Sequence, residues 1–600
     1  MKKIKAFFFN SLYSIKVTYK ASRQYFTLKL IFTITLSFFP FVNLYIWKNI
    51  INFLTNIKNY DGINYLIMNI VVYMLFYVIT EFFQRITGYI EYKYNDKVNI
   101  YIENLMLDKF AEVDLAFYDS SKFNDKVSRI WEIKYSMTNL ASQFFNTIQS
   151  LITFSTALIL LAALNAIYVL LILVLSVPIF VLKIKVNRMN SIFEENNVNI
   201  DRRIGYFKNL FTNINNSFDI RLFNIKDFFI SKFVKSWIEW YKRRKELTLK
   251  ASIFTLISLL ISTFINHILL YVLIIDKLSK KIIQIGDATY YISVFNQFYN
   301  STMRLIGTLS WTQYAYQQVV TVKEFIELNP IIPKSGTLEP KDFSKIEFLH
   351  VYFKYPGKEN YILEDCTFAI KRGQTIGLVG ENGSGKSTIV KLLLRLYDID
   401  GGQILLDGID IKEYDIVKYR AMFGVLFQDF ISYSFTLRQN IALSDYESIK
   451  EDERINDAIM KSELHDIVKS WEKGLETHLT RDFEPDGKEL SGGQWQRVAL
   501  ARVFFSDRNF IILDEPSASL DVFAEDKIFR QFEQLSDNRS SLIISHRLSS
   551  IVNADSIIVL KEGRIIEYGT HRDLLDANGY YADLFHLQAS RYITDEQKSK

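Results

Sequence analysis

Residues 380–387 read Gly380-Glu381-Asn382-Gly383-Ser384-Gly385-Lys386-Ser387. An apolar run at 376–379 precedes them and favours a strand, while the residues from Thr388 to Leu394 favour a helix. In that setting glycines let backbone N–H groups close around phosphate, and the start of the helix adds partial positive charge. The spacing predicts that residues 380–388 bind a nucleotide, with Lys386 on the β- and γ-phosphates and Ser387 on Mg²⁺.

A second apolar run, Phe510-Ile511-Ile512-Leu513, ends in two acids, Asp514 and Glu515. A strand there would bring Asp514 to the Mg²⁺ ion, mainly through water, and would place Glu515 where its carboxylate polarises an attacking water. The alternative is a buried strand that ends in two solvated acids.

A third stretch, Leu490-Ser491-Gly492-Gly493-Gln494, stands before a predicted helix at 495–504. Serine and glycine at a helix N-terminus form an anion site. The stretch lies far along the chain from the phosphate loop, so one nucleotide need not be enclosed by one chain. The alternative is a helix cap with no ligand.

The composition of the 600 residues divides the chain in two. Phe, Ile, Leu, Tyr and Asn dominate up to about residue 320, and glycines and charges typical of a soluble α/β domain return after about residue 335. Two prolines and a glycine within 329–336 mark the boundary. We expect a membrane domain at 1–328, a linker at 329–344, an ATPase domain at 345–590 and a tail at 591–600.

The first half contains six apolar segments of roughly the length that crosses a bilayer, about 20 residues. They lie at 28–54, 63–83, 144–164, 168–182, 251–275 and 286–309. The third and fourth almost touch at Asn165-Ala166, which predicts a tight hairpin. The long connections 84–143 and 183–250 are charged but keep helical periodicity, so we expect the helices to continue into water and to turn back near 118–123 and 217–223.

Charge gives the orientation of these spans. Lys and Arg crowd the long connections, which places them, the N-terminus and the ATPase domain in the cytoplasm. The lysines at 277, 280 and 281 favour the opposite side and are outnumbered. The net charge of +5 is explained by these membrane-orienting residues, so we expect no nucleic-acid partner. Cys366 is the only cysteine, which excludes an internal disulfide and predicts an inert buried thiol.

Polar side chains interrupt the sixth apolar segment at Asn296, Gln297 and Asn300. Polar groups inside a membrane usually face a bundle interior or a water-filled cavity, so these three are candidates for contact with a transported substrate. Hydrogen bonding between helices is the alternative. His267, in the fifth segment, is interpreted as structural.

Taken together, these motifs resemble the ATP-binding cassette (ABC) transporter superfamily over essentially the whole chain. The implied fold is a membrane α-helical bundle of six spans with long cytoplasmic extensions, followed by an α/β P-loop ATPase domain of ABC type. Three further residues resemble family positions. Tyr355 resembles the aromatic that stacks on adenine, Gln428 resembles the glutamine that senses Mg²⁺, and His546 resembles the switch histidine at the γ-phosphate. Ser519-Leu520-Asp521 resembles the loop that crosses the dimer interface.

The resemblance implies that two cassettes enclose two ATP molecules, with the 490–494 stretch of one chain closing on the phosphate loop of the other. The partner would be a second copy or a related half-transporter, and the presence of Glu515 favours a homodimer. The fused architecture is similar to exporters, embedded in the lipid of the cell membrane. The segments Ser121–Arg129 and Asp219–Asn224 then correspond to helices that couple the two domains.

Within the superfamily, residues 424–430, 436–445 and 489–496 resemble exporters of lantibiotics and related bacteriocin peptides. A peptide exporter is therefore the first hypothesis, and a multidrug or lipid exporter of the same architecture is the alternative. A non-transporting ATP-gated regulator is disfavoured by the intact Glu515 and Ser491. No cysteine-protease pattern precedes the spans, so another protein is expected to remove any leader peptide.

Overall fold

The computed structural model describes residues 2–55, 63–260, 264–333, 336–341, 343–516, 527, 530 and 539–590. The chain forms two compact units. The first comprises Met1–Ala111 and Val127–Leu328, and the second comprises Glu112–Lys126 and Asn329–Lys600.

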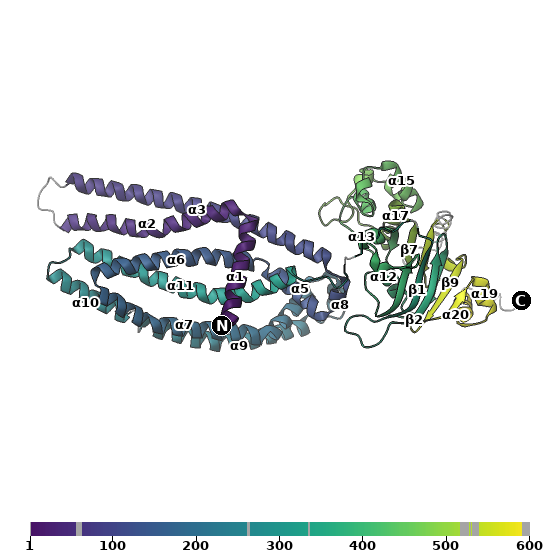
Figure 1. The fold of residues 1–600 in the computed structure, drawn as a ribbon, viewed down its shortest axis with the longest axis horizontal. Helices are drawn as coiled ribbons and strands as arrows, with labels where there is room; N and C mark the ends of the chain where they lie inside the picture. Colours follow the sequence, from purple (N-terminus) through teal and green to yellow (C-terminus); the bar gives the residue numbers. More distant parts are fainter. Residues whose placement is uncertain are drawn as a thin grey trace. The chain divides into compact units, whose positions relative to one another are not determined.

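The first unit consists of long helices in its described part (Figure 1). They are α1 (Lys2–Ala21), α2 (Arg23–Thr55), α3 (Ile63–Glu112), α6 (Ser136–Leu164), α7 (Ala166–Thr212), α8 (Ile214–Leu222), α9 (Lys226–Leu259), α10 (Ile265–Ser279) and α11 (Ile285–Ile326). The predicted hairpin at Asn165 is present: its side chain accepts hydrogen bonds from the N–H groups of Ile167 (2.8 Å) and Tyr168 (3.1 Å), which caps α7 directly after α6.

All six predicted spans fall on these helices, and the fifth is divided between α9 and α10 around 261–263, which lie outside the described residues. Among the described residues, three helical stretches are long and apolar enough to cross a membrane: Arg23–Thr55, Ile63–Glu112 and Arg129–Leu164. A shorter apolar helix covers Ala166–Pro178. The chain is thus a membrane-helix protein, while the count of six spans remains a prediction.

The long connections turn back through short helices. The first uses α4 (Leu115–Tyr118) and α5 (Ser121–Ile133), with the predicted break at 118–123 falling between them. The second is displaced from its predicted position, because α7 already ends at Thr212 and α8 occupies most of 217–223. Asn224 then takes a positive φ of 50° before α9 begins, a conformation that asparagine tolerates better than most residues.

The segment 112–126 belongs to the second unit because of specific hydrogen bonds. One carboxylate oxygen of Asp114 accepts from the backbone N–H groups of Ile331 (2.5 Å) and Ile332 (3.1 Å), just after the first unit ends. Asp119 accepts from the hydroxyl of Tyr397 at 2.8 Å. This turn between long helices is therefore tied to the chain that leads into the rest of the second unit.

The second unit is built on a six-stranded sheet with the order β10-β9-β3-β8-β7-β6. All neighbours in it are parallel except β10 and β9. Its strands are β3 (Thr375–Gly380), β6 (Phe423–Leu426), β7 (Phe510–Asp514), β8 (Ser540–Ile544), β9 (Ser556–Lys561) and β10 (Arg564–Gly569). A second sheet, β2-β1-β4-β5, contains β1 (Lys345–Phe353), β2 (Leu363–Lys371), β4 (Gly401–Leu406) and β5 (Ile409–Asp410).

Helices cover both faces of the parallel sheet, as the side-chain alternation along β7 requires. Ile511 and Leu513 join one buried cluster, together with α17 (Gly492–Ser506). Phe510 and Ile512 point to the other face and join the cluster that holds α12 (Lys386–Leu393). The strand is buried on both sides, so the two acids at its end emerge from a rigid element.

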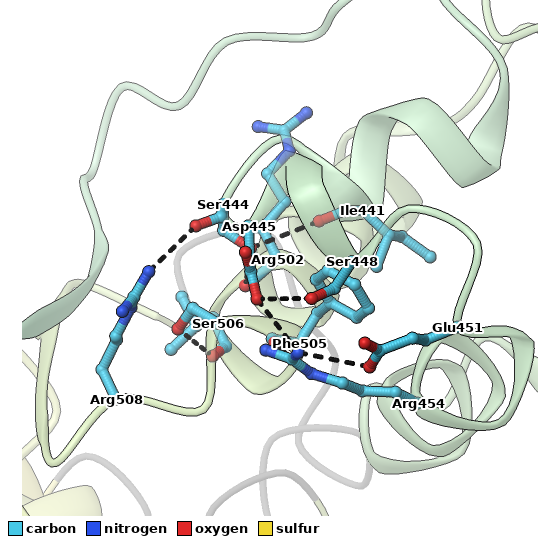
Figure 2. Close-up of polar contacts among 11 residues, drawn as sticks. Ile441, Ser444, Asp445, Ser448, Glu451, Arg454, Arg502, Phe505, Ser506 and Arg508 are labelled. Carbon is cyan, nitrogen blue, oxygen red and sulfur yellow. Dashed lines mark hydrogen bonds and ion pairs between the residues drawn. The ribbon is translucent and has the colours of Figure 1, made fainter. Parts of the chain in front are cut away.

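Short helices pack on α17 through arginine contacts (Figure 2). They are α14 (Leu437–Ala442) and α15 (Asp452–Lys461), and α16 (His465–Lys469) follows α15 in the chain. Arg454 of α15 donates to the carbonyl of Phe505 (2.9 and 2.5 Å), pairs with Asp445 at 3.0 Å and lies 4.5 Å from the centre of the Phe505 ring. Arg502 of α17 donates to the carbonyl and side chain of Asn440 in α14 (2.9 and 2.8 Å). These contacts fix α17, whose first turn carries Gly492, Gly493 and Gln494.

Among the described residues, the second unit also contains the α-helices α13 (Ile416–Arg420), α19 (His571–Asp576) and α20 (Tyr580–Ser590). The last two follow β10 in the chain, and α20 is the C-terminal helix of the described residues.

Candidate nucleotide site

Strand register brings the predicted site residues to one edge of the sheet. In the parallel pairs, Asp514 is opposite Ile544 of β8, and Leu378 of β3 is opposite the same residue. β6 ends one residue short of Asp514, with Leu426 opposite Leu513. Because the carboxyl ends of parallel strands meet at one edge, the phosphate loop, Gln428, Glu515 and His546 all follow strands that end there.

The phosphate loop runs from the end of β3 at Gly380 to the start of α12 at Lys386. Gly383 and Gly385 take positive φ angles of 82° and 109°, which side-chain-bearing residues rarely adopt. At Gly385 a Cβ atom would also stand 2.7 Å from a methyl carbon of Leu363. This glycine is required both by its backbone conformation and by the close approach of β2.

Lys386 is buried, and its ammonium group is held by its own loop. Nζ donates to the carbonyl oxygens of Gly380 (2.8 Å) and Glu381 (2.9 Å). Burial lowers the pKa of Lys386, and the nearby carboxylates of Glu515 and Asp514 oppose that shift. The ammonium of Lys386 is thus a buried cation bound to two backbone carbonyls of its own loop.

Asp514 is buried at the end of β7, and burial raises the pKa of its carboxyl, against a hydrogen bond with Ser387 that lowers it. Among the described residues, its Oδ1 atom is buried without a hydrogen-bond partner. A carboxylate in that situation is destabilised unless a cation or donor approaches it. Asp514 and Ser387 therefore lie side by side with unused capacity for a cation.

Glu515 is held by side chains from two other strand ends. Nε2 of Gln428 donates to Oε2 at 2.8 Å, and Nε2 of His546 lies 2.6 Å from Oε1. The backbone of Glu515 has a positive φ of 53°, and its N–H donates to the carbonyl of Ile544 at 2.9 Å. Glu515 is 17% exposed and His546 42%, so the carboxylate is oriented yet reachable by water.

These groups surround a cleft of about 490 Å³, within the range of small-molecule sites. Its lining consists of Tyr355, Ile362, Asn382, Gly383, Gly385, Lys386, Ser387, Thr388, Gln428, Glu515 and His546. Gly380, Glu381, Ser384 and Asp514 lie behind that surface or beside it. The half-buried Tyr355 donates to or accepts from Thr388 at 3.1 Å, and its ring is supported edge-on by Phe353 and Tyr397.

The stretch 491–494 does not line this cleft. It begins α17, where the side chain of Ser491 accepts from the N–H of Gln494 (3.4 Å) and the side chain of Gln494 accepts from the N–H of Ser491 (2.9 Å). Ser491 and Gly492 are exposed. Asp521 lies outside the described residues, so the structure says nothing of its predicted role.

The three amides predicted for a substrate cavity lie on α11. Asn296 and Asn300 are exposed and Gln297 is half-buried, whereas Phe295 and Phe298 on the same helix are packed in the core of the first unit. The ring of His267 meets Phe295 edge-on at 4.8 Å between ring centres. The exposed amides thus occupy a different face of α11 from the packed aromatics.

Sequence reasoning missed several residues at the cleft. Ile362 forms part of its wall, and Gln496 on α17 donates to the backbone carbonyl of Glu515 at 3.3 Å. Tyr580 donates to the side chain of Glu381 at 2.6 Å. Each of these contacts joins segments that are far apart in the chain, so no local sequence pattern predicts them.

Comparison with known proteins agrees with this geometry. Residues 363–518 match the family model described as ABC transporter. The chain carries an ABC transporter ATP-binding domain. It therefore binds ATP, and the predicted resemblance to fused ABC exporters that couple ATP hydrolysis to transport is confirmed.

Relatives of this chain extend over both units. It is 27% identical to the subtilin transport ATP-binding protein SpaT of Bacillus subtilis, over 98% of this chain and 95% of that protein. It is also 27% identical to the nisin transport ATP-binding protein NisT of Lactococcus lactis subsp. lactis, over 96% and 95%. A bacterial Atm1-family ABC exporter with ATP bound has the same fold, with a TM-score of 0.77, 20% identity and coverage of 95% and 99%.

Proposed function

We propose that this chain is one half of a dimeric exporter that uses ATP to move a peptide of lantibiotic or bacteriocin type out of the cell. The observation that carries the ATP-driven part is the convergence of Lys386, Glu515 and His546 on one cleft at the sheet edge. The peptide cargo is supported by similarity along nearly the full length to proteins named for subtilin and nisin transport.

The proposed hydrolysis uses this chain's side chains in distinct roles. The ammonium of Lys386 leaves the carbonyls of Gly380 and Glu381 and binds the β- and γ-phosphates. The carboxylate of Glu515 accepts the proton of the attacking water, and it is held for that task by Gln428 and His546. His546 also faces the γ-phosphate position. Tyr355 offers its ring to adenine, and residues 380–388 surround the phosphates.

The residues at the cleft fit a divalent cation. Ser387 and Gln428 would hold Mg²⁺ directly and Asp514 mainly through water. The Oδ1 atom of Asp514, which is buried and has no hydrogen-bond partner among the described residues, supports this assignment. Bound there, Mg²⁺ neutralises charge on the phosphates.

The site is completed, in this proposal, by a second chain. Ser491, Gly492, Gly493 and Gln494, together with Asp521, would reach the nucleotide held by the partner's phosphate loop. The position of residues 491–494 outside the cleft of their own chain supports this arrangement. Because Glu515 is present, we favour two copies of this chain over a pairing with a related half-transporter.

The membrane part of the proposal has six spans in the cell membrane, with the N-terminus and the ATPase domain in the cytoplasm. The proposed domain limits are 1–328, 329–344, 345–590 and 591–600. Asn296, Gln297 and Asn300 would face the cargo, and α5 and α8 would transmit the closure of the cassettes to the spans. The exposure of Asn296 and Asn300 is compatible with a water-filled pathway.

The alternative cargo is a drug or lipid. It is favoured by partial matches, such as 41% identity over 254 residues to the ATP-dependent lipid A-core flippase of Sodalis glossinidius, which spans 42% of this chain. The direct test is ATP-dependent uptake into inverted membrane vesicles, with a lantibiotic precursor, a dye and a fluorescent lipid in parallel. Uptake of the peptide alone, absent from vesicles carrying Glu515→Gln, is expected. Uptake of dye or lipid without peptide would select the alternative, and ATP hydrolysis without any uptake would favour a regulator.

A further inference from the structure

The C-terminal helix α20 touches two walls of the nucleotide cleft through its two ends. Tyr580, its first residue, contacts the phosphate loop, and Gln588 contacts the segment that carries His546. Eight residues along a helix span about 12 Å, so one rigid element bridges groups on different strands of the sheet.

The first contact concerns the charge of the phosphate loop. Glu381 places a carboxylate in a loop that must attract phosphates, and the hydroxyl of Tyr580 holds that carboxylate at 2.6 Å. Glu381 is not among the residues that line the cleft. A carboxylate released into the cleft would repel a polyphosphate. Tyr580 therefore keeps an unfavourable charge turned away from the ligand.

The second contact concerns the orientation of His546. The side-chain amide of Gln588 donates to the backbone carbonyl of His546 at 2.7 Å and accepts from the N–H of Leu548 at 3.0 Å. These two bonds bracket the turn after β8. The ring of His546 points from that turn to Glu515, 2.6 Å away. Gln588 thus fixes the backbone from which the histidine reaches the carboxylate.

The body of α20 is firmly anchored between these ends. Tyr581 and Ala582 are fully buried, and the hydroxyl of Tyr581 lies 2.7 Å from Nδ1 of His571 on α19. The backbone N–H groups of Tyr580 and Tyr581 both donate to the carboxylate of Glu567 on β10, at 2.6 and 3.0 Å. Because α20 is anchored along its length, its two ends are held at fixed positions.

We propose that α20 is a brace of the ATP site, in which Tyr580 holds Glu381 away from the phosphates and Gln588 positions His546 against Glu515. Both are positioning residues, because neither lines the cleft. The proposal rests on the assignment of the phosphate loop and His546 to ATP hydrolysis given above. The two ends of α20 have different effects: Tyr580 governs the affinity for nucleotide, and Gln588 governs turnover.

The test is steady-state ATP hydrolysis by the purified full-length chain in lipid nanodiscs. Gln588→Ala is expected to lower kcat about tenfold with little change in KM, the size of effect expected when one or two hydrogen bonds are lost. Gln588→Glu, which keeps the acceptor for Leu548 but loses the donor to His546, is expected to fall between wild type and Gln588→Ala. Asp583→Asn, an exposed change on the same helix, is the matched control and should behave as wild type.

Tyr580→Phe is expected to raise the KM for ATP about fivefold with kcat kept, since it removes one hydrogen bond to a charged group. In a Glu381→Gln background the same change should have no effect on KM, because no carboxylate remains to be held. The brace is overturned if Gln588→Ala and Tyr580→Phe match Asp583→Asn, or if Tyr580→Phe acts equally in both backgrounds. A wild-type chain without ATPase activity would instead overturn the proposed function.

Discussion

Serine and glycine residues surround the N-termini of two helices of the ATPase unit, and these N-termini are capped in opposite ways. The first residue of α12 is Lys386, and Gly385 before it has no side chain with which to cap the helix. The start of α17 is closed on itself, because Ser491 and Gln494 cap each other. The N-terminus of α12 faces the cleft that Glu515 and His546 line, whereas the N-terminus of α17 lies at the exposed surface of the same unit.

The difference indicates a site divided between two surfaces. An uncapped helix start leaves backbone N–H donors that water or a ligand must satisfy, and at α12 a buried lysine stands beside them. A self-capped, exposed start is stable without a ligand, so its Ser and Gly residues can contact a nucleotide only when another surface approaches. In the proposed function, one chain holds the phosphates and the partner supplies the second contact.

The largest effect is expected from Glu515→Gln, at the open cleft. Removal of a general base costs about a hundredfold or more in turnover, while the shape and the phosphate contacts remain. ATPase activity should fall to background, and binding of a fluorescent ATP analogue should persist. Activity close to wild type in this variant would contradict the role of Glu515.

The next effect is expected from Lys386→Ala. It removes the cation that faces the phosphates, and affinity for ATP should fall about tenfold or more, as for loss of a hydrogen-bonded charge pair. Equilibrium binding of labelled ATP measures it. Lys358→Ala, an exposed lysine in the loop after β1, is the control. Equal affinity in both variants would remove Lys386 from the site.

A smaller effect is expected from Ser491→Ala, and it separates capping from ligand contact. Loss of an N-cap costs roughly 1 kcal/mol of stability. Thr570→Ala removes the same kind of capping box from α19 and is the matched control. Both variants should lose similar thermal stability, but only Ser491→Ala should lose ATPase activity. Equal ATPase activity in the two variants would leave 491 as a cap alone.

The smallest effect is expected in the rate of thiol labelling, where Cys366 serves as the internal reference. This thiol is fully buried, and burial raises its pKa to about 11, so it stays protonated at pH 8 and resists alkylation in the folded chain. A cysteine at the exposed position of Ser491 should react rapidly. In a Glu515→Gln background, ATP should slow that reaction. Rapid labelling of the wild-type chain, or no protection by ATP, would count against the account.

Many residues at the cleft could be predicted from sequence because they fall in short contiguous motifs. The glycines at 383 and 385 determine the loop, and the acids at 514 and 515 follow directly on their strand. The brace formed by Tyr580 and Gln588 was not predictable, since it joins segments that only the folded sheet brings together. The same holds for Asp114, which follows the long helix α3 of the first unit and yet belongs to the ATPase unit.

The membrane half was less predictable for another physical reason. Helices that continue from the bilayer into water carry charged ends and polar interruptions, such as Asn296 and Asn300 on α11. The length and hydropathy of the described helices therefore single out three membrane-crossing stretches, whereas the apolar segments of the sequence predict six spans. Cargo contacts depend on which helix faces line the pathway, and no motif encodes that choice.

The central claim is that each ATP is held by Lys386 of one chain and Ser491 of the other. The most direct measurement is the ATPase activity of mixed dimers, purified through two different tags, that pair a Lys386→Ala chain with a Ser491→Arg chain. Each variant alone has two broken sites. The mixed dimer has one site with both defects and one intact site, so its activity should clearly exceed that of either variant alone. A mixed dimer as inactive as its parents would contradict the claim.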